Sequence, residues 1–246
     1  MFSKANIAVT LTLTALVLWV SPTYAAPLYS ITALPANTWA YAINNAGQVV
    51  GDTAVGGEAH AFIWSGGVLT DLGAVGTTSR ARAISSNGLV AGYSSSSEES
   101  GAFLRNGSAT IPLGTLGGAN SFGLGVNAAG HVVGQSNNAA GEFRGFLFSD
   151  GQMRDIGTLG GDFALATGIN NAGQVVGESS LNSEPGPAST VHAFLYENGA
   201  MRDLGTLGGS LSSAAAINGA GQVAGHSCTT GSVEHAFLYS DGIMID

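Results

Sequence analysis

An octapeptide pattern that returns five times along the chain limits the fold more than any other feature. Its clearest copy is Asn-Asn-Ala-Gly-Gln-Val-Val-Gly at residues 44–51. The other copies occupy residues 85–92, in a worn form, and residues 127–134, 170–177 and 218–225. The closing glycines are therefore separated by 41, 42, 43 and 48 residues. A fixed period of this length is typical of solenoids, propellers and arrays, so the chain is interpreted as five copies of one unit.

The first 25 residues lie outside the repeats and have the layout of a secretory signal peptide. Lys4 is followed by an apolar run over residues 7–20 and by small residues that end at Ala25. This order predicts cleavage after Ala25. An uncleaved anchor is the alternative, although the apolar run is shorter than the about 20 residues that a span needs. We therefore expect a signal peptide at residues 1–25 and a single repeat domain at residues 26–246, made of five units of about 41–48 residues.

The charge of the expected mature chain argues against nucleic acid as a partner. Lys4 is the only lysine, which leaves six arginines against sixteen acidic residues. The arginines are scattered from Arg80 to Arg202, so no basic patch for phosphates can form. We expect a secreted protein, extracellular or periplasmic, with no stable membrane anchor in the mature chain. Cys228 is the single cysteine and is interpreted as a small apolar residue of a strand, with a disulfide to a second chain as the other option.

The fourth repeat indicates what one unit builds. Four short segments, residues 166–169, 174–179, 191–196 and 200–204, are bounded by Gly, Asn, Ser or Pro and are typical of strands. The third segment is apolar on both faces, which predicts that it is covered on both sides. Four antiparallel strands per unit predict an all-β fold, a β-propeller of five four-stranded blades. The alternative is an open β-repeat array.

The two ends of the repeat region carry one strand more than five blades need. Residues 29–34 resemble a fourth strand, and the chain stops in another fourth strand at residues 243–246. We expect the first of these to pair near residues 242–246 and to close a ring, which leaves only short, protected edges. One phenylalanine of each repeat should then be buried between its own blade and a neighbour. These residues are Phe62, Phe103, Phe146, Phe194 and Phe237.

The third and fourth strands carry motifs that resemble a known family. The third strand contains His-Ala-Phe at residues 60–62, 192–194 and 235–237. The fourth strand leads into Asp-Ile/Leu-Gly-Thr-Leu-Gly-Gly at residues 155–161 and 203–209. Together with the octapeptide, these motifs resemble the bacterial extracellular HAF repeat family over essentially all of residues 28–246. The resemblance implies export and a repeated β architecture, and it brings no assigned reaction and no catalytic residues. The second and third repeats depart from it with Gly-Ala-Phe and Arg-Gly-Phe.

His60, His192 and His235 are the first candidates for chemistry. Equivalent positions on several blades can converge near an axis, so these side chains could surround a metal ion at about 2 Å. We favour a packing role, in which each imidazole bonds to a backbone carbonyl or to the fourth-strand aspartate. The Leu-Gly-Thr-Leu-Gly-Gly stretch lacks the lysine and the following helix of a phosphate-binding loop. Its glycines are expected to let the chain pass tightly from one blade to the next.

The acidic residues are spread along the chain at about one aspartate per repeat. Four of these aspartates are Asp71, Asp155, Asp162 and Asp203. This spacing suits hairpin and junction hydrogen bonds better than an acid–base pair, and the chain has no Gly-x-Ser-x-Gly elbow. Glu98 and Glu99, flanked by serines, could hold a weak calcium ion, but a solvated loop tip is the favoured interpretation. We therefore assign no catalytic, cofactor-binding or metal-binding residue and expect no cofactor.

Three hypotheses for the function follow. The leading one is a secreted, non-enzymatic propeller that binds a glycan or protein ligand through the variable loops 93–101, 135–144 and 179–191. It rests on the fact that every strong motif is repeated, whereas chemistry needs an asymmetric group of residues. The alternative is a polysaccharide hydrolase or lyase that uses carboxylates at the propeller mouth, about 5–10 Å apart. A second alternative is a structural building block of an extracellular matrix.

Overall fold

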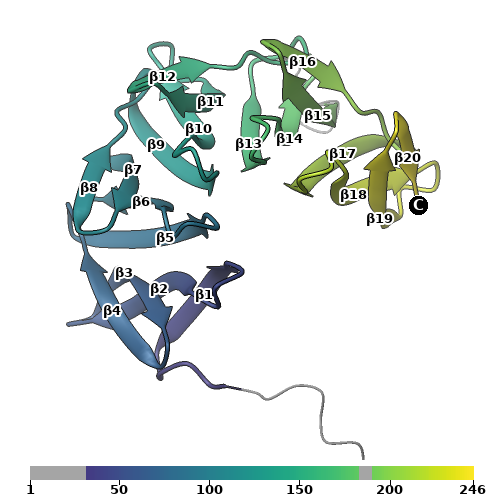
Figure 1. Ribbon diagram of the computed structural model, residues 1–246. Coiled ribbons are helices and arrows are strands. Elements are labelled where there is room, and N and C mark those ends of the chain that lie inside the picture. Colours follow the sequence, from purple (N-terminus) through teal and green to yellow (C-terminus); the bar gives the residue numbers. More distant parts are fainter. Residues whose placement is uncertain (1–31, 183–189) are drawn as a thin grey trace, which may run out of the picture. The chain divides into compact units, whose positions relative to one another are not determined.

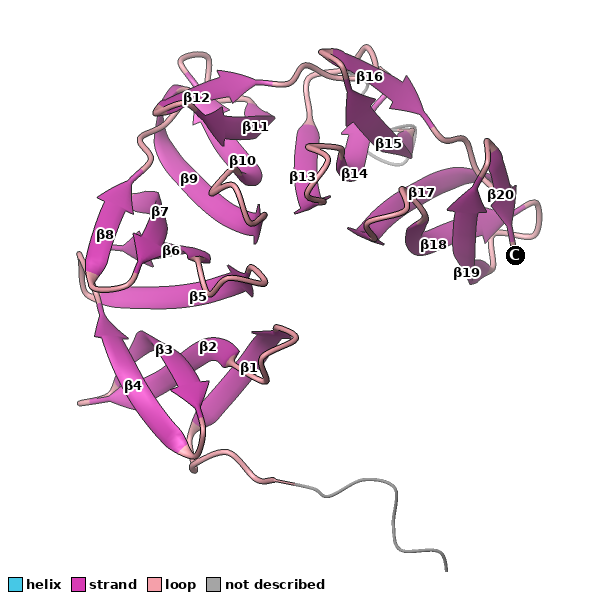
Figure 2. Cartoon of the chain, in the orientation of Figure 1, coloured by secondary structure: helices cyan, strands magenta, loops and turns pink. Residues whose placement is uncertain are grey.

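The structure is a computed structural model that describes residues 32–182 and 190–246. These residues form strands, turns and loops and contain no helix (Figure 2), as the strand pattern predicted. It follows that no helix in the described ranges could span a membrane. The expected signal peptide, residues 1–25, lies outside the described residues.

The strands group into five consecutive four-stranded blades, one for each repeat (Figure 1). The first blade contains β1 (Thr38–Ile43), β2 (Val49–Val55), β3 (Glu58–Ser65) and β4 (Val68–Gly73). The second contains β5 (Thr78–Ile84), β6 (Val90–Ser95), β7 (Ser100–Asn106) and β8 (Ala109–Pro112), and the third contains β9 (Gly117–Val126), β10 (Val132–Asn138), β11 (Phe143–Ser149) and β12 (Gln152–Asp155). The fourth contains β13 (Ala164–Ile169), β14 (Val175–Ser180), β15 (Val191–Glu197) and β16 (Ala200–Asp203), and the fifth contains β17 (Gly208–Ile217), β18 (Val223–Thr229), β19 (Glu234–Ser240) and β20 (Ile243–Ile245).

Each blade is an antiparallel meander in which every strand pairs with the next one in the chain. In the fourth blade, the four observed strands agree with the four predicted segments to within two residues at each end. Single parallel bridges join the second blade to the third, between Ser100 and Asn120, and the fourth to the fifth, between Val191 and Leu211. The sequence prediction of five four-stranded units is confirmed.

The octapeptide is the hairpin that joins the first two strands of a blade. In the fourth blade, the Asn170 side-chain oxygen accepts hydrogen bonds from Ala172 N at 3.1 Å and Gln174 N at 3.0 Å. Gly173 adopts a φ of 83°, in the left-handed region that glycine occupies at no steric cost. The Asn-x-x-Gly pattern therefore encodes this turn directly, with the asparagine replacing backbone partners that the turn leaves unpaired.

The closing glycine of the octapeptide is required by the packing of its strand against the strand before it. A Cβ added at Gly177 would lie 1.9 Å from the Leu165 carbonyl oxygen, and one added at Gly51 would lie 1.8 Å from the Trp39 carbonyl oxygen. These separations are far below van der Waals contact, so a side chain at this position displaces the backbone.

The core is divided among the junctions between consecutive blades. At the junction of the fourth and fifth blades, Val176, Ala193 and Leu195 pack with Ala214 and Val223. The other three junctions contain clusters of the same kind. The phenylalanine at the third-strand position is buried in all five blades, as predicted: Phe62, Phe103, Phe146, Phe194 and Phe237.

The predicted closure of a ring is not observed in the described residues. Residues 32–34 form no strand, and residues 29–31 lie outside the described ranges. Within the described residues, β20 pairs only with β19. Ala40 in the first blade and Ala236 in the fifth are exposed, so neither face is covered by the other. The prediction assumed that apolar end faces must be buried, whereas the internal junctions hold the blades together without that contact.

Candidate functional site

The His-Ala-Phe histidines lie on the third strand of their blades and bond to the aspartate on the fourth strand. The Nδ1 atoms of His60, His192 and His235 lie 3.0, 2.8 and 2.8 Å from carboxylate oxygens of Asp71, Asp203 and Asp246, respectively. The prediction of a packing role with the fourth-strand aspartate is confirmed. In the described ranges, no three His, Cys, Asp or Glu side chains converge as metal ligands.

The aspartate has a second bonding partner in the backbone that follows it. Asp71 Oδ1 accepts a hydrogen bond from Gly73 N at 2.7 Å, and Asp203 Oδ1 accepts one from Gly205 N at the same distance. Burial alone would raise the pKa of the Asp71 carboxyl. The hydrogen bonds from Gly73 and His60 outweigh that effect and hold this pKa below its ordinary value. Each His–Asp pair therefore fastens the outer edge of its blade.

Two blades depart from this pairing in different ways. In the third blade, Arg144 replaces the histidine and its Nε lies 3.1 Å from Asp155 Oδ2, so a cation still meets the aspartate. In the second blade, both positions are changed, because Gly101 stands in place of the histidine and Pro112 in place of the aspartate. The second blade is thus the one described blade that lacks a His–Asp or Arg–Asp pair at this position.

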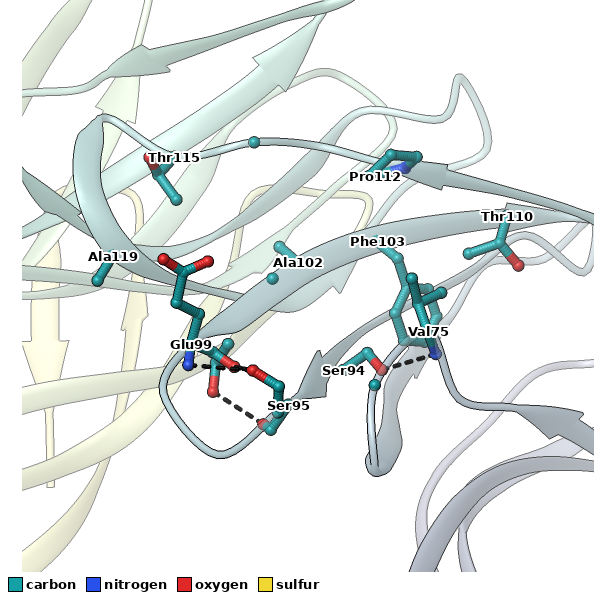
Figure 3. Close-up of a pocket in the computed structure, with 15 residues that line it drawn as sticks. Val75, Ser94, Ser95, Glu99, Ala102, Phe103, Thr110, Pro112, Thr115 and Ala119 are labelled. Carbon is teal, nitrogen blue, oxygen red and sulfur yellow. Dashed lines mark hydrogen bonds between the residues drawn. The ribbon is translucent and has the colours of Figure 1, made fainter.

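A pocket of about 400 Å³ opens at this place in the second blade (Figure 3). Gly101 and Pro112 both line it, beside the variable loop that follows β6. Its apolar lining is Val75, Ala102, Phe103, Pro112 and Ala119. Its hydroxyl groups belong to Ser94, Ser95, Ser96, Ser100, Thr110 and Thr115. Glu99 is the one charged residue of the lining, and Figure 3 shows its side chain rising from the loop toward Thr115 and Ala119.

Hydrogen bonds hold the loop of this pocket in place. Ser94 Oγ accepts from Val75 N at 3.0 Å and donates to Thr78 O at 2.9 Å, which joins the loop to the segment between the first two blades. Ser95 Oγ lies 2.8 Å from Ser100 Oγ across the mouth of the loop. The pocket is therefore largely formed before a ligand arrives, as small-molecule sites generally are.

The other two predicted loops do not line this pocket. Loop 135–144 contains a tight turn in which Gly141 N donates to Asn138 O at 3.0 Å. Loop 179–191 includes residues 183–189, which lie outside the described ranges. Glu98 and Glu99 lie at the tip of the exposed loop 93–101, in agreement with the solvated interpretation.

The inner ends of the second to fifth blades surround a hollow of about 230 Å³. Its described lining is apolar residues together with Ser85, Ser86, Asn127, Asn170 and Asn171, and it includes no carboxylate. The predicted aspartates lie elsewhere. Asp71, Asp155 and Asp203 are bonded on fourth strands, and Asp162 lies in the bend between β12 and β13.

The sequence interpretation missed an asymmetric cleft of about 340 Å³ next to β1. It contains Trp39, Tyr41 and the carboxylate of Asp52, which is almost fully buried and lies 3.4 Å from Arg80 Nε. Burial, followed by the hydrogen bond to Asp52, raises the pKa of Tyr41. The hydrogen bond to Tyr93 raises the pKa of Arg80 against the opposing effect of desolvation. These residues differ from their counterparts in the other repeats, and that difference was the sequence signal that could have revealed the cleft.

Comparison with known proteins identifies the architecture. No protein-family model and no curated protein matches the sequence. Among solved structures, the chain is similar to TolB from Acinetobacter baumannii, with a TM-score of 0.54 and 14% identity over 80% of this chain and 51% of that one. It is also similar to the β-propeller domain of the Trilobed protease from Pyrococcus furiosus, with a TM-score of 0.53 and 9% identity over 87% of this chain and 71% of that one. The fold is a β-propeller. The chain spans about half the length of TolB.

Proposed function

We propose that the protein is a secreted, non-enzymatic propeller of the HAF repeat type that binds a glycan in the second-blade pocket. One observation carries this proposal. The pocket occurs where Gly101 and Pro112 replace a side-chain pair that the other four repeats retain as His–Asp or Arg–Asp. A repeated scaffold with one interrupted position supplies the asymmetry that recognition needs.

The lining of the pocket suits a neutral sugar residue. An apolar wall around Phe103 and Pro112 can cover the C–H face of a sugar ring, and the serine and threonine hydroxyls can bond to its hydroxyl groups. Glu99 is the only charged group in the lining, and it can accept hydrogen bonds from a sugar but repels phosphate and other anions. The net charge of −9 for the whole chain also favours a neutral ligand over an anionic one.

The lining supports binding rather than glycoside hydrolysis. Hydrolysis uses two carboxyl groups, about 5–10 Å apart, on opposite sides of the bond to be broken. The described lining of the pocket supplies one acidic side chain, that of Glu99. We therefore prefer a lectin-like role to the hydrolase or lyase alternative.

The proposal is tested with a panel of neutral oligosaccharides and the double variant Gly101→His/Pro112→Asp. This variant restores the His–Asp pair in the second blade and fills the pocket. The substitution at Gly101 is sterically permitted, because no atom lies within 4 Å of an added Cβ. We expect the wild-type protein to bind a neutral sugar and the double variant to lose at least about tenfold in affinity, or about 1.4 kcal/mol.

His192→Ala is the matched control, because it breaks a His–Asp pair in the fourth blade and leaves the pocket intact. It should bind the sugar as the wild type does. A panel without any bound neutral sugar, or a double variant with undiminished affinity, contradicts the proposal. Export is tested separately by mass spectrometry of the exported protein, in which an N-terminus at Ala26 is expected and an intact Met1 peptide contradicts secretion by cleavage.

A further inference from the structure

The first and fifth blades each leave exposed several positions whose equivalents are buried at the internal junctions. We define the leading face as the β1 surface around Thr38, Ala40 and Ile43. We define the trailing face as the surface of β18 and β19 around Ala236 and Leu238. At an internal junction, a trailing-type face of one blade packs on a leading-type face of the next.

The trailing face matches positions that are buried in the preceding blades. Ala236 is exposed, whereas its equivalents Ala61, Ala102 and Ala193 are buried. Leu238 is 44% exposed, whereas its equivalent Leu195 is 3% exposed and contacts the next blade. The fifth blade therefore keeps an apolar surface of the kind that the earlier blades use to hold a neighbour.

The leading face shows the reciprocal pattern. Ala40 is exposed, whereas the equivalent Ala81, Ala166 and Ala214 are fully buried against the preceding blade. On the same face, Ile43 is 68% exposed, whereas its equivalent Val126 is 9% exposed at the junction of the second and third blades. Apolar residues exposed here but buried at the equivalent internal positions mark this face as an interaction surface.

The two faces also carry complementary hydrogen-bonding groups. At three internal junctions, a leading-face serine accepts a hydrogen bond from the backbone N–H of the His-Ala-Phe alanine position, as Ser212 does from Ala193 N at 2.9 Å. Thr38 holds the serine position in the first blade. In the described part of the chain, no Ser or Thr hydroxyl accepts from Ala236 N. A junction between the fifth and first blades would bring Ala236 N to Thr38.

A second pair of groups repeats this match at the inner ends of the blades. Asn44 Nδ2 donates to Ser85 O, and Asn170 Nδ2 donates to Asn218 O, in each case across a junction at 3.0 Å. Asn218 Nδ2 bonds within its own turn, to Gln222 Oε1 at 2.8 Å, and no cross-junction acceptor is found among the described residues. The Asn44 carbonyl holds the position of that acceptor in the first blade.

We infer that the protein associates head to tail with a second copy of itself, through the trailing face of one chain and the leading face of the next. The contact reproduces the internal junction, with its apolar core and its two hydrogen bonds. Because the two faces differ, the contact is heterologous and leaves one face of each kind at the ends of the assembly, so it can continue to further copies or close into a ring of copies. The inference does not depend on the proposed glycan site.

Two variants and their mixture test this inference by sedimentation velocity and light scattering of the purified full chain. We expect the molar mass of the wild-type protein to rise with concentration. Ala40→Arg blocks the leading face and Leu238→Arg blocks the trailing face, so each variant alone should remain monomeric. Mixed together, they should form a one-to-one dimer that does not grow, because each variant supplies the face that the other lacks.

Ile111→Arg is the matched control, since Ile111 is an exposed apolar residue of β8 outside both faces. It should associate as the wild type does. Circular dichroism melts of the variants establish that they fold. A wild-type protein that stays monomeric overturns the inference, whether the faces remain free or cover each other within one chain. A mixture of folded variants that stays monomeric also overturns it, because the free trailing face of one variant should join the free leading face of the other. A single variant that still associates contradicts it as well, because a contact between like faces would then be responsible.

Discussion

The inter-blade hydrogen bond of the octapeptide asparagine allows a comparison within a single molecule. Asn170 is buried, and its side chain makes four hydrogen bonds. Three of them stay in its own turn, and the fourth reaches Asn218 O in the next blade at 3.0 Å. Asn218 makes the same three bonds in its turn, but it is exposed and lacks the fourth. The two residues therefore differ by one inter-blade bond and by burial.

The expected cost of removing each side chain follows from these contacts. A hydrogen bond contributes about 0.5–1.5 kcal/mol net, and a buried group left without a partner costs more than an exposed one. Asn170→Ala should therefore lower the free energy of unfolding by about 3 kcal/mol. Asn218→Ala should lower it by about 1–2 kcal/mol, because water can replace the lost partners in an exposed turn.

Urea unfolding followed by far-UV circular dichroism measures both variants against the wild type. Comparable m-values are needed, since a changed slope signals loss of a single cooperative transition. Asn170→Asp is the control, because it retains acceptor oxygens for the turn and removes both donated hydrogen bonds. Its cost should equal or exceed that of Asn170→Ala, because it places a buried carboxylate against the Asn218 carbonyl oxygen. Equal losses for Asn170→Ala and Asn218→Ala would refute the claim that the asparagine joins neighbouring blades.

Three further outcomes are expected from the same kind of measurement. Phe194→Ala empties a fully buried site at the junction of the third and fourth blades and should cost about 3–5 kcal/mol in urea unfolding. Gly177→Ala forces a Cβ to within 1.9 Å of a carbonyl oxygen and should cost at least about 3 kcal/mol in thermal melts, whereas Gly219→Ala, with no atom within 4 Å, should be neutral. Because the pKa of Asp71 is lowered in the folded state, its contribution to stability is present above about pH 4 and is lost as the pH falls through that lowered pKa. His60→Ala should therefore weaken this part of the acid dependence, and an unchanged acid titration would contradict the role of the pair.

The repeat made most of the fold predictable from the sequence. The Asn-x-x-Gly turn recurs in four copies, with Ser85 in place of the asparagine in the second, and the closing glycine and the phenylalanine position recur in all five. Ring closure was not predictable in the same way. It depends on the angle that each junction sets between blades, and that angle comes from packing rather than from a motif.

The candidate site was only partly predictable. Loop 93–101 was identified because it is variable and polar, and it does line the pocket of about 400 Å³ in the second blade. The change at Gly101 was noted only as a departure from the family pattern. Its effect became clear when the structure placed Gly101 beside Pro112, on the strand pair where other blades hold a His–Asp contact. In other blades, the third-strand histidine and the fourth-strand aspartate lie eleven residues apart. The loss of both residues in the same repeat was the sequence signal for the pocket.

Amide hydrogen exchange with and without the best-binding neutral sugar tests the central claim most directly. The second-blade pocket predicts that exchange slows in residues 94–103 and 110–119, which form its loop and its wall. Exchange in the equivalent segments of the other blades should not change, because His–Asp or Arg–Asp pairs fill the corresponding space there. Protection in the loops of another blade, or no protection in the second blade at saturating sugar, would contradict the account.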